Sequence, residues 1–275
     1  MIISLVSMDM VEQEITMNDK VTGFILKQSD YKDYGVILSV LTKEHGKLSI
    51  VANGVRKPTS KNAGRLIPYT KGEFLIDYKE NKTIFSLKNV STIETYKNMH
   101  MDLSLSTCLS VIGEMSDSFV MNGEESEYYK EVYDSLELSF TLLENHKDPI
   151  TVLSLFCSDI MKYFGISADV DECVHCGSSL VQAISIKEGG FLCKECATKE
   201  GVSLKDAATL KRFRLICKGS LRQFEIIEKC GGATYDDLKN LIEMIRIHTG
   251  IKIRSFGLFE RLFGKPNSSG VSPKF

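Results

Sequence analysis

Four cysteines stand in two closely spaced pairs, Cys173-Val174-His175-Cys176 and Cys193-Lys194-Glu195-Cys196. Sixteen residues separate the pairs, which lies within the range typical of a four-cysteine zinc site. A spacing of two residues lets one tight turn direct both sulfurs at the same ion, and Gly177 permits the positive φ that such a turn often needs. Four thiolates complete a tetrahedron around Zn²⁺ and leave no position for water. The pattern therefore predicts a structural zinc site rather than a catalytic one.

The other cysteines and a flanking histidine bear on this prediction. Two disulfides, or a pair of turns without metal, are the alternatives, and His175 is placed to replace one cysteine ligand. Bound zinc stabilises small modules of this kind by about 10 kcal/mol. Cys108, Cys157 and Cys217 fall on apolar helical stretches, where cysteine acts as a small buried side chain, and Cys230 precedes a Gly-Gly loop. This distribution of cysteines indicates a protein of the reducing cytosol rather than one held together by disulfides.

The second feature that indicates a binding site is a run of cations. From residue 46 to residue 72 the chain carries no Asp or Glu. The formal net charge is only −2, so this basic island indicates a polyanion site on a nearly neutral protein. We predict that nucleic acid is bound by the following cations: Lys43, Lys47, Arg56, Lys57, Lys61 and Arg65. An ordinary solvated charge run is the alternative.

Aromatic side chains and a second basic cluster extend the prediction. Tyr31, Tyr34 and Tyr69 are candidates for stacking on bases, although core positions suit each of them at least as well. A predicted helix after the cysteines turns its apolar residues to the core and so leaves three cations outward: Lys211, Arg212 and Arg214. These cations either extend the nucleic-acid track or form an ordinary solvated surface.

Catalytic signatures are missing from the sequence. It contains no H-E-x-x-H, no G-x-S-x-G and no Walker A loop, and its five histidines are scattered. We therefore predict a protein that is not an enzyme. No run of about eighteen apolar residues occurs, so no membrane span is predicted. The N-terminus lacks the basic region and the cleavage site of a signal peptide.

Hydrophobic alternation predicts short strands in the first third of the chain. The expected strands are 21–28, 34–41, 47–52, 73–78 and 83–90. Five strands in about 75 residues suit a small closed barrel, and the OB-fold is the five-strand barrel that binds oligonucleotides. An SH3-like barrel is the competing fold. The basic island fills the longest connection, residues 53–70, and loops carry function more often than the scaffold does.

From about residue 100 the apolar period becomes helical. Asp148-Pro149 marks the cap and first turn of one helix, and a short helix is expected at 256–263. The predicted fold class is α+β, with an OB-fold barrel followed by an all-α domain that carries an inserted zinc module. The expected boundaries are 1–16 for an N-terminal extension, 17–95 for the barrel, 96–263 for the helical domain, 171–198 for the module and 264–275 for a flexible tail.

Together these residues resemble the RecO family of bacterial recombination mediators, from about Met17 to Gly264. The resemblance is carried by Thr42–Ser49, by Gly54–Ser60 with Pro68–Thr70, and by the cysteine stretch with Gly189–Cys193. Many zinc ribbons share the cysteine spacing. The order of barrel, helices, zinc insert and further helices is much more specific, although the extension before Met17 departs from the family pattern.

The resemblance implies an N-terminal OB domain, a helical domain with the zinc site, binding of single- and double-stranded DNA, and annealing of complementary strands. It also implies work with RecR on DNA coated by the single-strand-binding protein, so that RecA is loaded. In this family the coat protein docks through its acidic, apolar C-terminal tail, for which Lys211, Arg212 and Arg214 are candidate contacts. A cytoplasmic, nucleoid-associated location follows. An RNA-binding module with the same parts, or an adaptor that binds only proteins, is the alternative.

Overall fold

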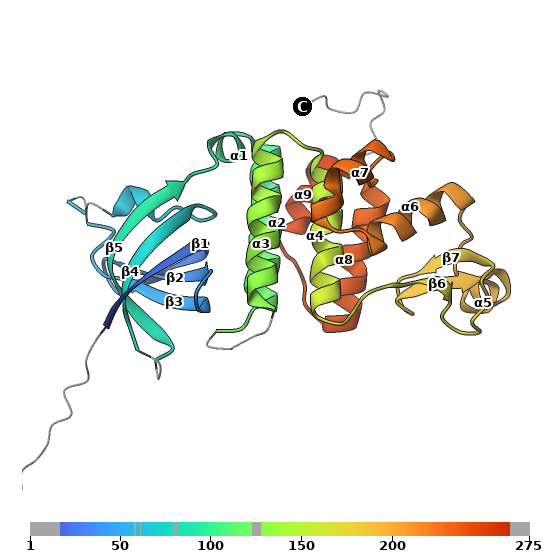
Figure 1. Cartoon of the computed structure of the whole chain (residues 1–275), viewed down its shortest axis with the longest axis horizontal. Coiled ribbons are helices and arrows are strands. Elements are labelled where there is room, and N and C mark those ends of the chain that lie inside the picture. The colour runs from blue at the N-terminus through green and yellow to red at the C-terminus, as the bar shows by residue number, and fades with distance from the viewer. Residues whose placement is uncertain (1–16, 58, 61, 80–81, 123–127, 265–275) are drawn as a thin grey trace, which may run out of the picture.

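The computed structural model describes residues 17–57, 59–60, 62–79, 82–122 and 128–264. The predicted extension at 1–16, Lys61 of the basic island and the tail from residue 265 lie outside the described residues. Figure 1 shows the barrel at one end of the molecule, helices in the middle and the cysteine-bearing module at the other end. The two predicted sites therefore lie far apart. Among the described helices, none is both long and apolar enough to cross a lipid bilayer.

The barrel confirms the expected OB-type architecture. Its strands are β1 (Met17–Tyr31), β2 (Gly35–Thr42), β3 (Gly46–Ala52), β4 (Lys71–Tyr78) and β5 (Ile84–Glu94). Within the described residues they close in the order β1–β2–β3–β5–β4, with β3 and β5 parallel. β1 is longer than predicted because its first half pairs with β4 and its second half with β2. A bulge between Ile25 and Lys27 separates the two halves.

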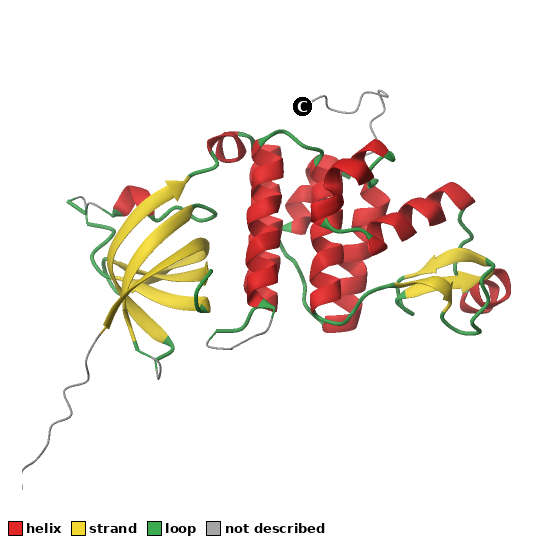
Figure 2. Cartoon of the chain, in the orientation of Figure 1, coloured by secondary structure: helices red, strands yellow, loops and turns green. Residues whose placement is uncertain are grey.

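The alternating residues of the predicted strands point by turns into the barrel and away from it. Val36, Leu38 and Val40 point inward and are fully buried, whereas Ile37 and Ser39 between them lie on the outer surface. The long connection between β3 and β4 contains one short 3₁₀ turn, η1 (Ala63–Arg65). This connection, which carries the basic island, therefore lies on the outside of a packed barrel (Figure 2).

Helices fill the middle of the molecule (Figure 2). Those before the module are α1 (Lys97–Met101), α2 (Leu103–Phe119), α3 (Tyr129–Glu144) and α4 (Pro149–Tyr163). Those after it are α6 (Ala207–Lys218), η2 (Leu221–Gln223), α7 (Phe224–Lys229), α8 (Tyr235–Thr249) and α9 (Phe256–Phe263). The predicted start of α4 is confirmed, because the Asp148 carboxylate accepts the N–H of Thr151 at 2.8 Å and Pro149 occupies the first turn.

The module between α4 and α6 has its own small sheet, which periodicity did not predict. Its elements are β6 (Asp169–Cys173), β7 (Val181–Ser185), β8 (Gly190–Cys193) and α5 (Lys194–Glu200). The strands lie in the order β6–β8–β7. Few apolar residues are buried within it, so this unit is too small to be held by a hydrophobic core alone.

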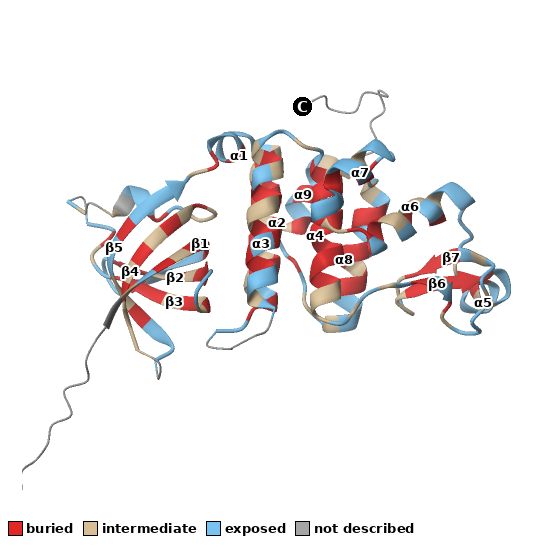
Figure 3. Ribbon diagram, viewed as in Figure 1, coloured by how far each residue is buried: buried red, intermediate tan, exposed pale blue. Residues whose placement is uncertain are grey.

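The apolar cluster of the helices extends onto the outside of the barrel, beside the barrel's own core; Figure 3 shows buried residues in both parts. Phe24, Leu26 and Leu41 face outward from the barrel, yet they are buried in the cluster formed by the helices. The ring of Phe24 makes edge contacts with Tyr133 and Phe140 of α3, with centroids 5.2 and 5.7 Å apart. The outer surface of β1 and β2 is therefore partly an internal surface of the molecule.

Candidate metal centre and nucleic-acid interface

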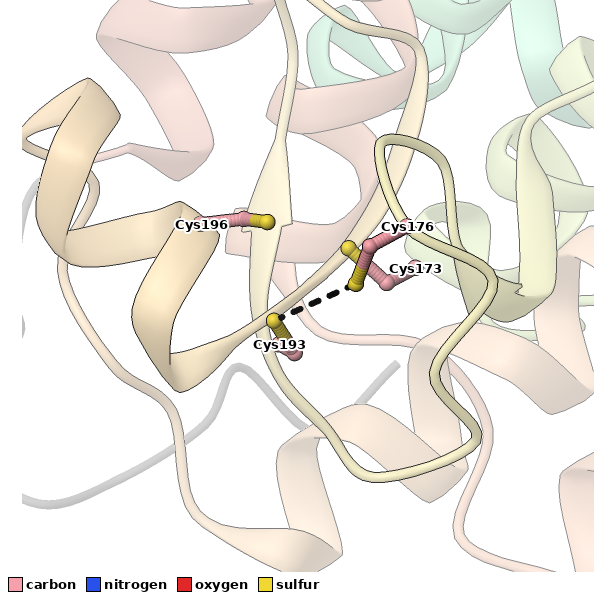
Figure 4. A group of neighbouring side chains, drawn as sticks. All are labelled: Cys173, Cys176, Cys193 and Cys196. Carbon is pink, nitrogen blue, oxygen red and sulfur yellow. Dashed lines mark hydrogen bonds between the residues drawn. The ribbon is translucent and has the colours of Figure 1, made fainter.

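The cysteines of the module converge on one point (Figure 4). Cys173 ends β6, Cys193 ends β8, and Cys196 projects from the first turn of α5. Cys176 follows β6 in a turn completed by Gly177, whose φ of 69° is the positive value expected there. All the ligand sulfurs lie within 4.8 Å of one another. The predicted grouping of the cysteines is therefore confirmed.

Distances and charge within the group fit a tetrahedral dication site. The sulfurs of Cys176 and Cys193 are 3.7 Å apart, and Zn–S bonds of about 2.3 Å place sulfurs about 3.8 Å apart in a tetrahedron. A disulfide would need about 2.0 Å, and all the cysteines are free thiols. Burial raises the pKa of Cys173, but backbone N–H groups near its sulfur lower it to about 6. Hydrogen bonding to the Cys193 sulfur raises the pKa of Cys196, because neighbouring sulfurs cannot all be anions without a cation.

His175 is engaged elsewhere. Its Nε2 lies 3.2 Å from the Glu188 carboxylate, and among the described residues the group of possible metal ligands comprises the cysteines alone. The residues present thus fit a structural zinc ion with four thiolate ligands, and His175 is not needed as a replacement.

Two of the three predicted partner-binding cations belong to the scaffold. Arg212 of α6 pairs at 2.6 Å with Asp237 of α8, whose side chain is only 1% exposed. Arg214 donates to the Val170 carbonyl at 3.2 Å and to the Asp171 carboxylate at 2.7 Å. Arg212 therefore joins two helices. Arg214 is exposed, as predicted, but it is paired with the module. Lys211 is exposed and makes no ion pair within the described ranges.

Arg56 fixes the basic loop on the turn between β1 and β2. Its guanidinium donates to the carbonyls of Lys32 and Asp33 at 3.1 and 3.0 Å and pairs with the Asp30 carboxylate at 2.6 Å. The Arg56 backbone N–H also donates to the Tyr34 carbonyl at 3.0 Å. Arg56 is therefore a positioning residue, and it sets the place of the cations beside it.

Two cation–aromatic pairs are the result of this arrangement. The Lys57 ammonium lies 5.6 Å from the centroid of the Tyr34 ring, and the Lys32 ammonium lies 5.0 Å from that of Tyr31. Tyr34 is 52% exposed, and both lysines are exposed. We call Tyr31, Lys32, Tyr34 and Lys57 the tyrosine–lysine cluster. Sequence reasoning missed Lys32, although its position next to Tyr31 gave the same signal as the island.

The other predicted DNA-binding residues are dispersed. Lys47 is only 11% exposed, and its ammonium donates to the carbonyl and carboxylate of Asp117 on α2. Arg65 donates to the Val90 carbonyl of β5 at 3.1 Å, which fixes the far end of the loop. Lys43 is exposed, but it lies at the opposite end of β2 from the tyrosine–lysine cluster. Lys61 lies outside the described residues.

The outer face of β2 and β3 is covered by the helical part. Ser39 of β2 donates to the Asp117 carboxylate at 2.6 Å, and Asn122 donates to Ser49 of β3 at 2.9 Å. In OB-folds the face formed by these strands is the usual oligonucleotide surface. Here the helical part occupies some of that face.

Tyr69 lies between barrel and helices rather than on the open barrel surface. It adopts a left-handed conformation with φ 65°, and its ring rests against Gly113 of α2. A Cβ at position 113 would lie 2.3 Å from the ring. This contact between residues far apart in sequence left no local signal.

Comparison with known proteins gives two family matches. The family model "Recombination protein O N terminal" matches residues 17–96, and "Recombination protein O C terminal" matches residues 100–255. Similar curated proteins include the DNA repair protein RecO of Bacillus pumilus, 28% identical over 67% of this chain and 71% of that protein. The DNA repair protein RecO of Bacillus velezensis is 24% identical over 91% of this chain and 97% of that protein. That of Caldicellulosiruptor bescii is 28% identical over 76% and 84%, respectively.

Proposed function

Because this chain belongs to the RecO family, we propose that it acts in DNA repair and recombination as a mediator. It binds single- and double-stranded DNA and anneals complementary strands. With RecR it helps RecA to load onto DNA coated by the single-strand-binding protein. The tyrosine–lysine cluster is the observation that supports a nucleic-acid role most directly, because it combines exposed cations with one exposed and one half-buried aromatic ring on an OB-type barrel.

The chemistry of this role is non-covalent. Lys32 and Lys57 neutralise phosphates, and the rings of Tyr31 and Tyr34 offer faces on which bases stack. Arg56 holds the loop so that both pairs lie on the same turn. Neutralised backbones repel each other less, so a second strand can approach bases that are held open. No bond is made or broken in these steps.

Zinc has a structural part in this proposal. Cys173, Cys176, Cys193 and Cys196 would hold it, and it would neutralise the thiolates and fix the turns of the module. Arg214 and Lys218 both pair with Asp171 at the start of the module, at 2.7 and 2.5 Å. The orientation of the module on α6 thus depends on these ion pairs as well as on the metal.

The partner tail is better placed in a groove between α8 and α9 than on α6. This groove of about 560 Å³ has apolar walls from Ile242, Ile253 and Phe256. Its polar lining contains two ion pairs, Lys239 with Glu260 and Arg246 with Glu243, and two cations without an ion pair among the described residues, Lys252 and Arg254. An acidic, apolar tail matches both features. We expect Lys252→Ala to weaken binding of a labelled tail peptide about tenfold by fluorescence anisotropy, while Lys211→Ala changes it less than twofold.

The DNA-binding proposal predicts a specific loss of affinity. A Lys32→Ala/Lys57→Ala/Tyr34→Ala variant should bind a labelled single-stranded oligonucleotide at least tenfold more weakly in fluorescence anisotropy, because two phosphate contacts and one stacking face are removed. The slope of log affinity against log salt should become shallower by about 1.4, or about 0.7 for each lost phosphate contact.

A matched control separates local contacts from net charge. The variant Lys199→Ala/Lys229→Ala also removes two exposed lysines, from α5 and from the end of α7. It should keep wild-type affinity and slope. Equal weakening in both variants would show that overall charge, and not the cluster, determines DNA affinity. Failure of the wild type to bind DNA would leave the adaptor that binds only proteins as the function. A preference for RNA over DNA of the same sequence would favour the RNA-binding alternative.

A further inference from the structure

A cleft of about 620 Å³ lies between the barrel and the helices. Lys27 and Tyr69 line it from the barrel, Ser110 lines it from α2, and Lys252 and Arg254 line it from the segment between α8 and α9. Its size lies within the range of sites that hold small ligands. Tyr69, a stacking candidate from the sequence, lines the cleft, whereas the cations predicted to bind DNA do not.

Tyr69 gives this cleft an aromatic wall. Its left-handed φ of 65° is costly for a bulky residue, and such strain persists only where the surrounding structure enforces it. The ring rests on Gly113, and Ser110 lines the same cleft, so α2 supports the ring on one side. The ring is only half-buried. A fixed, partly open ring of this kind is a stacking surface.

The charge in the cleft is unbalanced toward positive. Its acids are already engaged: Glu114 accepts the N–H groups of Arg254 and Ser255 at 2.9 and 2.8 Å, and Asp117 binds Lys47. By contrast, the side chains of Lys27, Lys252 and Arg254 are exposed and make no ion pair in the described part of the chain. Such a cleft attracts an anion.

The cleft is connected to the tyrosine–lysine cluster along β1. Residues 27–30 are all exposed and lead from Lys27 to Tyr31. At about 3.3 Å per residue this path is about 13 Å long. This part of β1 pairs with β2 only, because the pairing with β4 ends at Phe24. Within the described residues, no strand is paired with the other edge of this segment, so the path along it is open.

We infer that a single nucleic-acid strand bound on the tyrosine–lysine cluster continues along β1 into this cleft. One nucleotide stacks there on Tyr69, and the phosphates beside it contact Lys27, Lys252 and Arg254. This inference rests on the proposed DNA binding and extends its track across the boundary between barrel and helices.

Photocrosslinking of the wild-type protein tests the path without a variant. The probe is an oligothymidylate in which single positions carry 5-iodouracil, and crosslinked peptides are identified by mass spectrometry. We expect crosslinks to Tyr69 from some positions and to Tyr31 or Tyr34 from others. The order of positions along the oligonucleotide should follow the order of these tyrosines along the track.

Two variants give a second readout. Lys27→Ala/Arg254→Ala should bind the oligonucleotide about tenfold more weakly, with a salt slope shallower by about 1.4 for two lost phosphate contacts. Tyr69→Phe should keep the aromatic crosslink, because the ring face is retained. Lys199→Ala/Lys229→Ala is again the control, expected to match the wild type.

The outcomes separate the two proposals. Crosslinks confined to Tyr31 and Tyr34, together with unchanged binding by Lys27→Ala/Arg254→Ala, would overturn the cleft and leave the barrel site standing. Absence of oligonucleotide binding by the wild type would overturn the proposed function itself. Crosslinks at Tyr69 with weakened binding by the variant would support the cleft.

Discussion

Replacement of Cys176 by serine is expected to remove tight zinc binding and to unfold the module. A four-thiolate site contributes on the order of 10 kcal/mol to the folding of such a unit, and the buried apolar residues here are too few to compensate for its loss. Cys176 is the exposed member of the group, so the change creates no cavity that would complicate interpretation. Zinc released to a chromogenic chelator, measured together with the melting temperature, checks this expectation.

Cys230→Ser is the matched control for that experiment. Cys230 is also an exposed thiol, but it lies at the end of α7, outside the cysteine group. We expect this variant to hold one zinc ion per chain and to melt like the wild type. Retention of one zinc ion by Cys176→Ser, as resistant to the chelator as in the wild type, would contradict the assigned ligand set.

Arg212→Ala is expected to lower the free energy of unfolding by about 3–5 kcal/mol, because it leaves a buried carboxylate without its partner. That carboxylate, Asp237, also accepts the Thr234 N–H at 2.8 Å and the Thr234 hydroxyl at 2.7 Å at the start of α8. Urea denaturation followed by circular dichroism measures the loss. An added Asp237→Asn change should restore part of the stability, since it removes the unpaired charge while keeping a side chain that accepts hydrogen bonds.

Lys211→Ala is the control for Arg212→Ala. It tests whether the loss of stability comes from the ion pair with Asp237 or from replacing any cation on α6. Lys211 precedes Arg212 and is exposed, so its replacement should change stability by less than about 0.5 kcal/mol. If Arg212→Ala unfolds like Lys211→Ala and instead loses binding of the partner tail, Arg212 has the partner role predicted from the sequence and the structural role is wrong.

The parts of this molecule that were predictable are those encoded locally. The cysteine spacing fixes which sulfurs meet, because two short turns bring them together whatever the rest of the chain does. Alternation predicted a strand at 34–41, which corresponds to β2, and Asp148-Pro149 predicted the start of α4. The order of the barrel strands was not predicted, since periodicity alone does not specify that β3 pairs with β5.

The candidate site was less predictable because its members depend on distant partners. Lys47 looked like part of the basic island, but Asp117, seventy residues away, takes its ammonium. Arg56 was counted as a DNA contact, whereas its carbonyl and carboxylate partners come from the preceding turn. The sequence shows which residues of the basic island are cations. It does not show which of them remain unpaired after folding.

The apolar contact between barrel and helices has a mechanical consequence. Phe24, Leu26 and Leu41 anchor the barrel in the helical cluster, and Lys71 of β4 also pairs with Glu137 of α3. Force applied to the barrel would therefore pass directly into the helices through these apolar and ionic contacts.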